Sequence, residues 1–372
     1  MLPGRKTRVL SYRGELVRGD PANLQTLPDT YLGPVIRASK GQKVRIHFTN
    51  GLDEKSSIHW HGLRVPEKMD GHPRDAIAAW LTYTYEFPIL NRAGTYWYHP
   101  HPHQRTGFQA YHGLAGLFLV SDHEEANAGL PAGEYDVPLV IQDRTFDIHN
   151  QLVYSAGGTG GGMTGSGMER MMGFLGDRIL VNGRLDFSLP VATHAYRLRL
   201  LNGSNSRVYK LAWSDGAPLT VIATDGGLLA KPVQRQYLML GPGERIELWA
   251  DFSSLPVGTE RTLQSLEFTG AEGGMSGSQN LPNGAPFPVL KVRVEREASD
   301  KASLPAQLST LARYRREDAA NGSAPRSFQL SLRQTQWQIN GRVFQMDNGG
   351  RRRSGAAERA GGVGIHRHAE PR

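Results

Sequence analysis

The chain of 372 residues contains no cysteine. This absence excludes a disulfide scaffold, a thiolate nucleophile, an iron–sulfur cluster and any zinc or copper centre that needs a thiolate ligand. No apolar run reaches the roughly 18 residues needed to span a bilayer, so no transmembrane segment is predicted. The opening residues, MLPGRKTRVLSYRGE, are basic but have no apolar core, so no signal peptide is predicted within this chain.

Positive charge is concentrated at the C-terminal end of the chain. The net charge is +8, and residues 349–372 contribute six Arg against two Glu, which is half of that excess. Basic and aromatic residues are not interleaved in the manner of a nucleic-acid surface, so no nucleic-acid partner is predicted. The length predicts about two domains with cores of their own.

Helical periodicity is scarce, whereas short alternating segments and turns are common, with 44 Gly and 22 Pro. This pattern predicts an all-β fold of tandem Greek-key β-sandwiches. Asn182-Gly183 and Asn202-Gly203 have the composition of hairpin turns. Strands are expected within Pro34–Thr49, Tyr96–Tyr98, Leu114–Val120, Val137–Gln142, Arg178–Val181, Tyr196–Leu201, Leu219–Ala223 and Arg245–Ala250.

Composition shifts divide the chain. We expect a first sandwich over 1–122, a linker over 123–133, a second sandwich over 134–295, a linker over 296–325, the opening strands of a third unit over 326–348 and a Gly/Arg-rich tail over 349–372. The tail has too little apolar surface to order itself. It is either a natural disordered tail or the product of a reading-frame shift. The shift is favoured because Trp337–Asp347 opens a unit that does not continue.

The histidines carry the strongest chemical signal. His59-Trp60-His61 and His99-Pro100-His101-Pro102-His103 each place histidines two residues apart. In a strand such residues project from one face, so each pair presents two imidazoles together. Imidazole suits copper, zinc, iron and nickel, and the spacing alone leaves zinc open. The two prolines place the second motif at a sheet edge or an extended rim.

The surrounding sequence resembles the multicopper oxidases, above all bacterial laccase-like and copper-efflux oxidases. The resemblance extends over about residues 30–348. In the first domain it rests on Ser57–Leu63 (SIHWHGL), Met69-Asp70-Gly71, Gly94–His101 (GTYWYHPH) and Gly113–Gly116 (GLAG). In the second it rests on Gly176-Asp177 with Ile179–Gly183 (ILVNG), Arg197–Gly203 (RLRLLNG), Asp225–Leu229 (DGGLL) and Gly241–Arg245 (GPGER), which are mainly structural. Ile339–Asp347 (INGRVFQMD) is similar to the start of the third domain.

The resemblance implies tandem cupredoxin-like domains and a share of a trinuclear copper cluster. By position, His59 would bind the type 2 copper, and His61, His99 and His101 the type 3 pair. Asp70 matches an acidic residue that helps to deliver protons to dioxygen, although Met-Asp-Gly is also good turn chemistry. His103 and His112 match no family ligand and are expected to be polar rim residues.

The chain departs from the family in one severe respect. The other four cluster histidines and the His/Cys/His set of the type 1 copper belong to the third domain, and this chain has no cysteine. His366-Arg367-His368 lacks the aromatic strand context of a ligand pair. Met163, Met168, Met171 and Met172 either gather Cu(I), which prefers thioethers, or fill gaps in a loop, and the second interpretation is favoured.

The sequence suggests three candidate functions. The favoured one is a laccase-like oxidase that couples oxidation of phenols or metal ions to reduction of dioxygen, incomplete and of low or no activity alone. The second is a non-catalytic cupredoxin-like copper-binding or envelope scaffold protein. The third, a zinc hydrolase, explains the histidines but not the sequence around them. By resemblance, the expected location is the periplasm or the exterior, with dioxygen and a small reducing substrate as partners; homo-oligomer formation is left open.

Overall fold

The computed structural model describes residues 4–154, 173–269, 281–319, 321, 325–333, 336–346 and 363–366. The chain forms two compact units, Met1–Thr310 and Leu311–Arg372. The domain boundaries expected from the sequence are finer than this division and stay predictions. Among the described residues, no helix has both the length and the apolar character needed to cross a membrane.

The first sandwich of the larger unit begins with a five-stranded sheet in the order β1-β2-β7-β6-β4. A separate pair, β3 and β5, packs against it through a core in which the Trp60 ring lies 5.4 Å from those of Tyr85 and Phe87. The elements are β1 (Leu24–Gln25), β2 (Val35–Ser39), β3 (Lys43–Thr49), β4 (His59–His61), β5 (Thr82–Pro88), β6 (Gly94–His99), α1 (Thr106–Tyr111), β7 (Gly116–Ser121) and α2 (His123–Asn127).

The second sandwich pairs a seven-stranded sheet, β10-β9-β8-β12-β17-β14-β15, with a five-stranded sheet, β11-β19-β18-β13-β16. Leucine, valine and isoleucine side chains from both sheets fill the space between them. The strands are β8 (Asp136–Arg144), β9 (Arg178–Val181), β10 (Arg184–Leu185), β11 (Ser188–Ala192), β12 (Ala195–Asn202), β13 (Tyr209–Trp213), β14 (Leu219–Thr224), β15 (Gly227–Arg235), β16 (Leu238–Leu240), β17 (Arg245–Asp251), β18 (Glu260–Ser265) and β19 (Phe287–Arg296).

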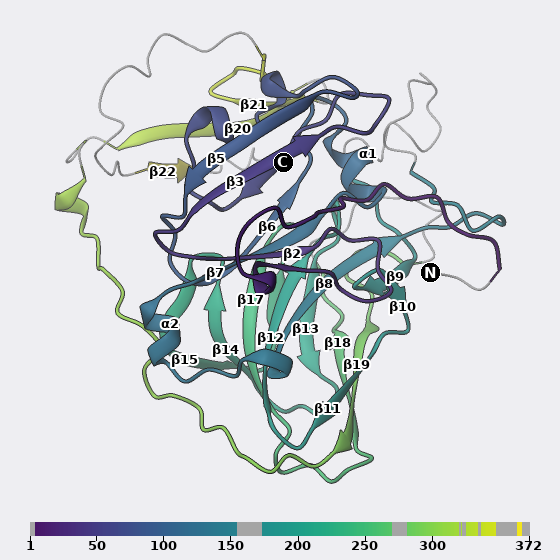
Figure 1. Cartoon of the computed structure of the whole chain (residues 1–372), viewed down its shortest axis with the longest axis vertical. Coiled ribbons are helices and arrows are strands. Elements are labelled where there is room, and N and C mark those ends of the chain that lie inside the picture. Colours follow the sequence, from purple (N-terminus) through teal and green to yellow (C-terminus); the bar gives the residue numbers. More distant parts are fainter. Residues whose placement is uncertain are drawn as a thin grey trace. The chain divides into compact units, whose positions relative to one another are not determined.

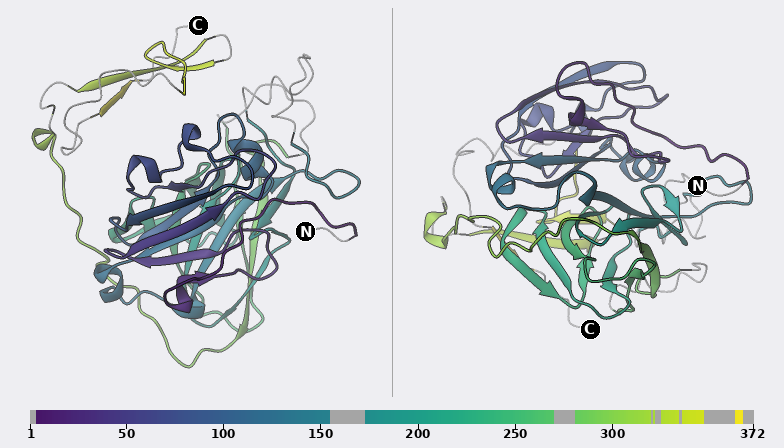
Figure 2. Two further views of the ribbon diagram at one scale, coloured as in Figure 1. Left: turned by 45° about the horizontal axis from the view of Figure 1, so that its top comes forward. Right: turned by 60° about the horizontal axis from the view of Figure 1, so that its bottom comes forward.

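The all-β tandem sandwich prediction is confirmed. Neighbouring strands in each sheet are often distant in sequence, as Greek-key connections require. Three pairs (β2–β7, β8–β12 and β11–β19) are parallel and interrupt the antiparallel order. Figure 2 shows the two sandwiches as adjoining layers, the first in purple to blue and the second in teal to green.

A shared seam joins the two sandwiches. One apolar cluster combines Trp97, Leu117 and Leu119 of the first with Val140 and Leu201 of the second. Beside it lies a buried charge network that includes Thr95 of β6, Glu125 of α2, Asp136 of β8, Arg197 and Arg199 of β12 and Glu247 of β17. Contacts of both kinds fix the first sandwich against the second.

The two expected hairpin turns have different outcomes. Asn182-Gly183 joins β9 to β10, with both residues at positive φ (49° and 77°), so this prediction is confirmed. Asn202-Gly203 is not a hairpin, because β12 pairs with β17 and β8 instead of with β13. The Asn202 side chain donates to the carbonyls of Arg207 and Leu240 and so organises a longer connection.

The smaller unit holds a three-stranded sheet in the order β21-β20-β22. Its strands are β20 (Arg326–Arg333), β21 (Gln336–Ile339) and β22 (Val363–His366). The first two fall in the expected opening strands of a third unit, and β22 lies inside the stretch predicted as a tail. Figure 1 labels β20, β21 and β22.

Candidate metal centre

The register of β4 against β6 brings the two histidine motifs together. His59 lies directly opposite His99, and His61 lies opposite Trp97 in this antiparallel pair. Because alternate residues share a face, Trp60 and Tyr98 point into the core, where both are buried, and the histidines line the other face. Two segments about 40 residues apart in the sequence thus form one imidazole cluster.

Ring nitrogens in this cluster face one another closely. One nitrogen from each of His59, His61 and His99 falls within 4.8 Å of the others. The Nδ1 atom of His61 lies 3.2 Å from the Nε2 atom of His99. The ring of His101, just beyond the end of β6, is centred 5.3 Å from that of His59 and 5.9 Å from that of His99. The structure thereby gathers all four histidines that the sequence singled out.

Backbone carbonyls fix which nitrogen of two imidazoles carries the proton. His59 Nδ1 lies 2.9 Å from the carbonyl oxygen of Asp70, and His99 Nδ1 lies 2.9 Å from that of Pro100. A carbonyl oxygen only accepts, so both Nδ1 atoms donate. In the neutral rings the Nε2 atoms therefore keep their lone pairs, which is the state that a metal ligand needs.

Asp70 is brought to His59 by a tight turn. Gly71 has a φ of 65°, and a Cβ atom there would lie 2.0 Å from the carbonyl oxygen of Ile58, so this position requires glycine. The close approach places an Asp70 carboxylate oxygen 3.1 Å from His59 Nδ1. Asp70 can therefore be both a turn residue and the acidic residue beside the cluster, because the turn brings its carboxylate to His59.

Burial and neighbouring charges separate the pKa values of the cluster. Burial lowers the pKa of His61 to about 4, with the positive charge of Arg245 as the next cause. Burial also lowers the pKa of His99 and of His101, and repulsion from a positive charge on His59 lowers both pKa values further. Burial opposes charge on His59 too, but hydrogen bonds and attraction from Asp70 raise its pKa. At neutral pH His61, His99 and His101 are neutral.

The donor set fits a copper ion. Among the described residues none hydrogen-bonds the buried Nδ1 atom of His101, although a buried polar atom normally has a partner. Neutral imidazoles that converge without a thiolate suit Cu(II) and also zinc. The geometry therefore supports a metal centre, and its chemistry alone does not choose between these ions.

His103 and His112, the two histidines expected at a polar rim, are not among the ring nitrogens that converge in the described cluster. His112 donates from Nδ1 to the carbonyl of Phe108, and its ring packs 4.0 Å from the ring of that residue. His103 is exposed in the turn before α1. The side chains of His366 and His368 and the four methionines at 163, 168, 171 and 172 lie outside what the structure describes.

Two neighbours of the cluster were missed at the level of sequence. The Trp97 ring stacks on His61 at 4.9 Å, and the alternation Trp97, His99, His101 could have revealed that it shares their face. Arg245 acts on His61 from the second sandwich, where the Gly241–Arg245 motif appeared only structural. Nothing in the local sequence links that motif to a histidine in another domain.

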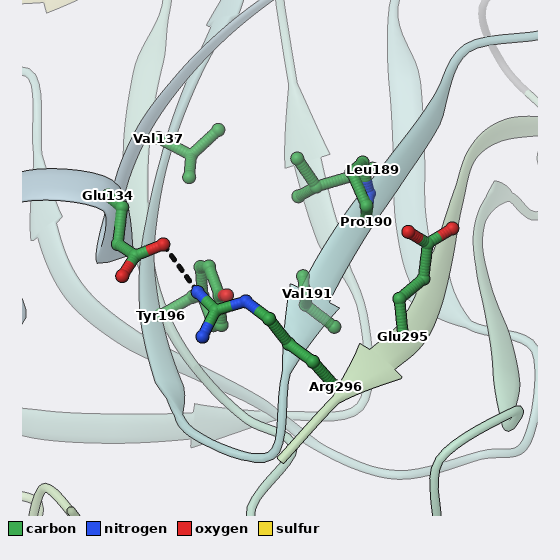
Figure 3. Close-up of a pocket in the computed structure, with 8 residues that line it drawn as sticks. All are labelled: Glu134, Val137, Leu189, Pro190, Val191, Tyr196, Glu295 and Arg296. Atoms are coloured by element: carbon green, nitrogen blue, oxygen red, sulfur yellow. Dashed lines mark hydrogen bonds and ion pairs between the residues drawn. The ribbon is translucent and has the colours of Figure 1, made fainter. Parts of the chain in front are cut away.

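A pocket of about 220 Å³ lies away from the cluster, in the second sandwich. Figure 3 shows it between β11, β12 and the end of β19, with Glu134 and Arg296 paired across it. Its lining contains none of the predicted site residues. The histidine cluster is therefore the candidate site.

The part of the chain that holds this cluster is similar to known proteins. A family profile described as multicopper oxidase matches residues 13–125, which include all four histidines and Asp70. The solved structure of the McoA multicopper oxidase from Aquifex aeolicus is similar with a TM-score of 0.75 and 36% identity, over 92% of this chain and 68% of that one.

Curated relatives include proteins with two different names. Multicopper oxidase mco of Staphylococcus aureus is 36% identical over 65% of this chain and 51% of its own length. Cell division protein FtsP of Escherichia coli is 38% identical over 63% of this chain and 48% of its own length. The chain thus spans about half the length of the curated relatives that it matches.

Proposed function

The chain belongs to the multicopper oxidase family, and we propose that its histidine cluster holds copper as part of a laccase-like oxidase. The proposed ligands are His59 for the type 2 copper and His61, His99 and His101 for the type 3 pair. The proposed reaction couples oxidation of phenols or metal ions to reduction of dioxygen to water.

One observation carries this proposal. The His59–His99 register brings ring nitrogens of three histidines within 4.8 Å of one another. Charged imidazoles repel one another, and the 3.2 Å contact between His61 Nδ1 and His99 Nε2 accounts for the approach of only two of the rings. A metal ion would account for the convergence of the whole cluster.

The protein's own residues would prepare the site in two ways. The carbonyls of Asp70 and Pro100 hold the Nδ1 protons of His59 and His99, and so aim both Nε2 lone pairs away from the backbone. Copper, when bound there, supplies one-electron redox chemistry that protein side chains lack. Reduction of dioxygen consumes protons, and the partly exposed carboxylate of Asp70, 3.1 Å from His59 Nδ1, would take them from solvent and pass them toward the cluster.

The absence of cysteine limits what this polypeptide does alone. A type 1 copper needs a cysteine thiolate, and this chain has none. We therefore propose an incomplete set of copper ligands, with weak copper binding and little or no oxidase activity unless further sequence supplies the rest.

Copper stoichiometry and oxygen uptake test this proposal together. After copper loading and desalting, we expect the chain to retain substoichiometric copper and to consume dioxygen with a phenol at the background rate. The coding DNA beyond the Asn348 codon is then read in every frame and the longer product assayed. A chain that binds no Cu(II) even in an equilibrium titration would overturn the proposal, and so would rapid oxygen uptake by the chain alone, which requires a full ligand set.

A non-catalytic scaffold is the second candidate. The observation in its favour is the similarity to cell division protein FtsP, which at 38% identity is close to the 36% identity to multicopper oxidase mco. A scaffold that binds copper would retain the ion, but no extension of the chain would bring turnover. Oxygen uptake by the extended product therefore separates the two functions.

Location and partners follow from the family proposal. We propose that the protein acts in the periplasm or outside the cell, where it meets dioxygen and a small reductant. Fractionation of cells that express the native gene, with an enzyme of the cytoplasm as marker, tests this. Recovery with the cytoplasmic marker would contradict it.

A further inference from the structure

A turn of the second sandwich lies against the histidine cluster of the first. This turn, Gly241–Arg245, connects β16 to β17. A Cβ atom added at Gly243 would lie 3.2 Å from Cε1 of His61 and 3.5 Å from Cζ2 of Trp97. The His61 imidazole, already stacked on Trp97 at 4.9 Å, is thus bounded by the Gly243 backbone as well.

The turn is itself held in place by hydrogen bonds. The Gly243 N–H donates to the carbonyl of Asn202 at 2.8 Å, and the Asn202 N–H donates to the carbonyl of Glu244 at 3.0 Å. The Gly241 N–H donates to the Glu244 carboxylate at 2.6 Å. Because these hydrogen bonds tie the turn to Asn202 at the end of β12, the Gly243 backbone cannot easily move away from the imidazole.

Arg245 connects the same turn to both strands that carry histidines. Its Nε atom donates to the carbonyl of Thr95 on β6 at 3.1 Å. Its Nη2 atom lies 2.7 Å from where a Cβ atom would stand at Gly62, the residue after His61. The Asp225 carboxylate, itself partly exposed, pairs with the buried Arg245 guanidinium at 2.8 Å and so helps to fix its direction.

We propose that the Gly241–Arg245 turn positions the His61 imidazole, with the Gly243 backbone as a steric wall and Arg245 as a positioning residue. This inference rests on the proposed role of His61 as a copper ligand. The second sandwich is then part of the metal centre's geometry and more than a spacer.

Gly243→Ala, with Gly216→Ala as its control, tests the steric wall. Gly216 also has a positive φ (76° against 79°), but a Cβ atom there meets nothing within 4 Å. The two variants therefore share the backbone strain and differ in the contact with His61. In ¹⁵N-histidine-labelled protein without metal, we expect Gly243→Ala to shift the His61 ring resonances and Gly216→Ala to leave them unchanged.

Copper affinity is measured on the same samples by titration with Cu(II) followed by EPR. We expect Gly243→Ala to weaken binding about 10-fold and to change the Cu(II) spectrum, since groups that orient ligands typically contribute that much. Equal resonances and equal spectra in the two glycine variants would overturn the inference while leaving the proposed function intact. If the parent chain binds no copper, the proposed function fails, and the metal-free resonances still decide whether the turn positions His61.

Arg245→Gln provides an independent variant, should Gly243→Ala fail to fold. Arg261→Gln is its control, because Arg261 likewise pairs with an aspartate, Asp215, and lies over an aromatic ring, Trp213, in the second sandwich. We expect the His61 resonances to move in Arg245→Gln and to return toward their original positions in Arg245→Lys. Unmoved resonances in Arg245→Gln would overturn the role of Arg245.

Discussion

Thr95, on the strand that carries His99, donates a hydrogen bond from Oγ1 to Oε1 of Glu247 in the second sandwich, at 2.7 Å. Glu247 also pairs with Arg197 at 2.5 Å and with Arg199 at 3.0 Å, and all three charged side chains are at least 97% buried. The Glu247 carboxylate thus pairs with two buried guanidinium groups and also accepts a hydrogen bond from a strand of the first sandwich.

Glu247→Gln should therefore destabilise the protein strongly. The amide keeps the shape but removes one of three carboxylate charges that face Arg197 and Arg199, leaving those of Glu125 and Asp136. It also turns an amide N–H toward a guanidinium, and losing a buried hydrogen bond to a charged group costs about 1.5–3 kcal/mol of unfolding free energy. Urea unfolding followed by tryptophan fluorescence measures the change. Glu86→Gln is the control, because Glu86 pairs with Lys43 and Arg45 at the surface, and it should alter the unfolding midpoint little. Equal losses in both variants would contradict the role of the seam.

Acid should weaken the same seam. Burial raises the pKa of Asp136 and of Glu247, but the charges of Arg199 and Arg197 outweigh it and lower both pKa values in the folded state. A carboxylate with a lowered folded pKa stabilises the fold above its unfolded pKa of about 4, and this contribution is lost as pH falls through the folded value.

The melting temperature should therefore fall steeply below about pH 4, and Glu247→Gln should flatten that part of the profile. The buried neutral histidines lower the melting temperature at higher pH, from about pH 6.5 downward, because the unfolded chain takes up their protons first. This effect is the same in the parent protein and in Glu247→Gln. A scan of melting temperature between pH 3 and 8 in both proteins separates the two pH ranges. Parallel profiles below pH 4 would contradict the assignment to Glu247.

Single histidine variants should remove the copper. His61→Ala and His101→Ala each delete one nitrogen from a set that is already partial, so we expect neither variant to retain copper after desalting. His47→Ala is the matched control, because His47 is exposed on β3 and contacts Thr84 instead of the cluster. If both cluster variants keep as much copper as His47→Ala, the ion binds elsewhere in the chain.

The copper-loaded chain should not be blue. The intense visible band of a type 1 centre needs Cu–thiolate bonding, and the chain has no cysteine. Visible absorption and EPR of the loaded protein should show nitrogen-ligated Cu(II) only. An intense blue band with the narrow copper hyperfine splitting of a type 1 site would rule out this ligand set.

Much of the fold could be predicted from local pattern. The alternation in residues 34–49 predicted β2 and β3, and Asn182-Gly183 predicted a hairpin, because in both cases the signal lies within a few residues. The hairpin predicted at Asn202-Gly203 was wrong, because this dipeptide follows β12, whose partners β8 and β17 lie far away in sequence. Pairing partners are chosen by the whole sheet and not by the turn alone.

The site divides in the same way. The two-residue spacing predicted that each motif presents its histidines on one face, and His59, His61 and His99 do share a cluster. The contribution of Gly243 and Arg245 could not be predicted, because it depends on how two sandwiches pack along their seam. Packing between domains leaves no periodic trace in either sequence segment.

Anomalous diffraction at the copper edge, from crystals soaked in Cu(II), tests the central claim most directly. The account predicts a copper peak within coordination distance of the ring nitrogens of His59, His61 and His99, and its loss in His61→Ala crystals. A peak only at other residues, or equal peaks in the parent and His61→Ala crystals, would contradict it.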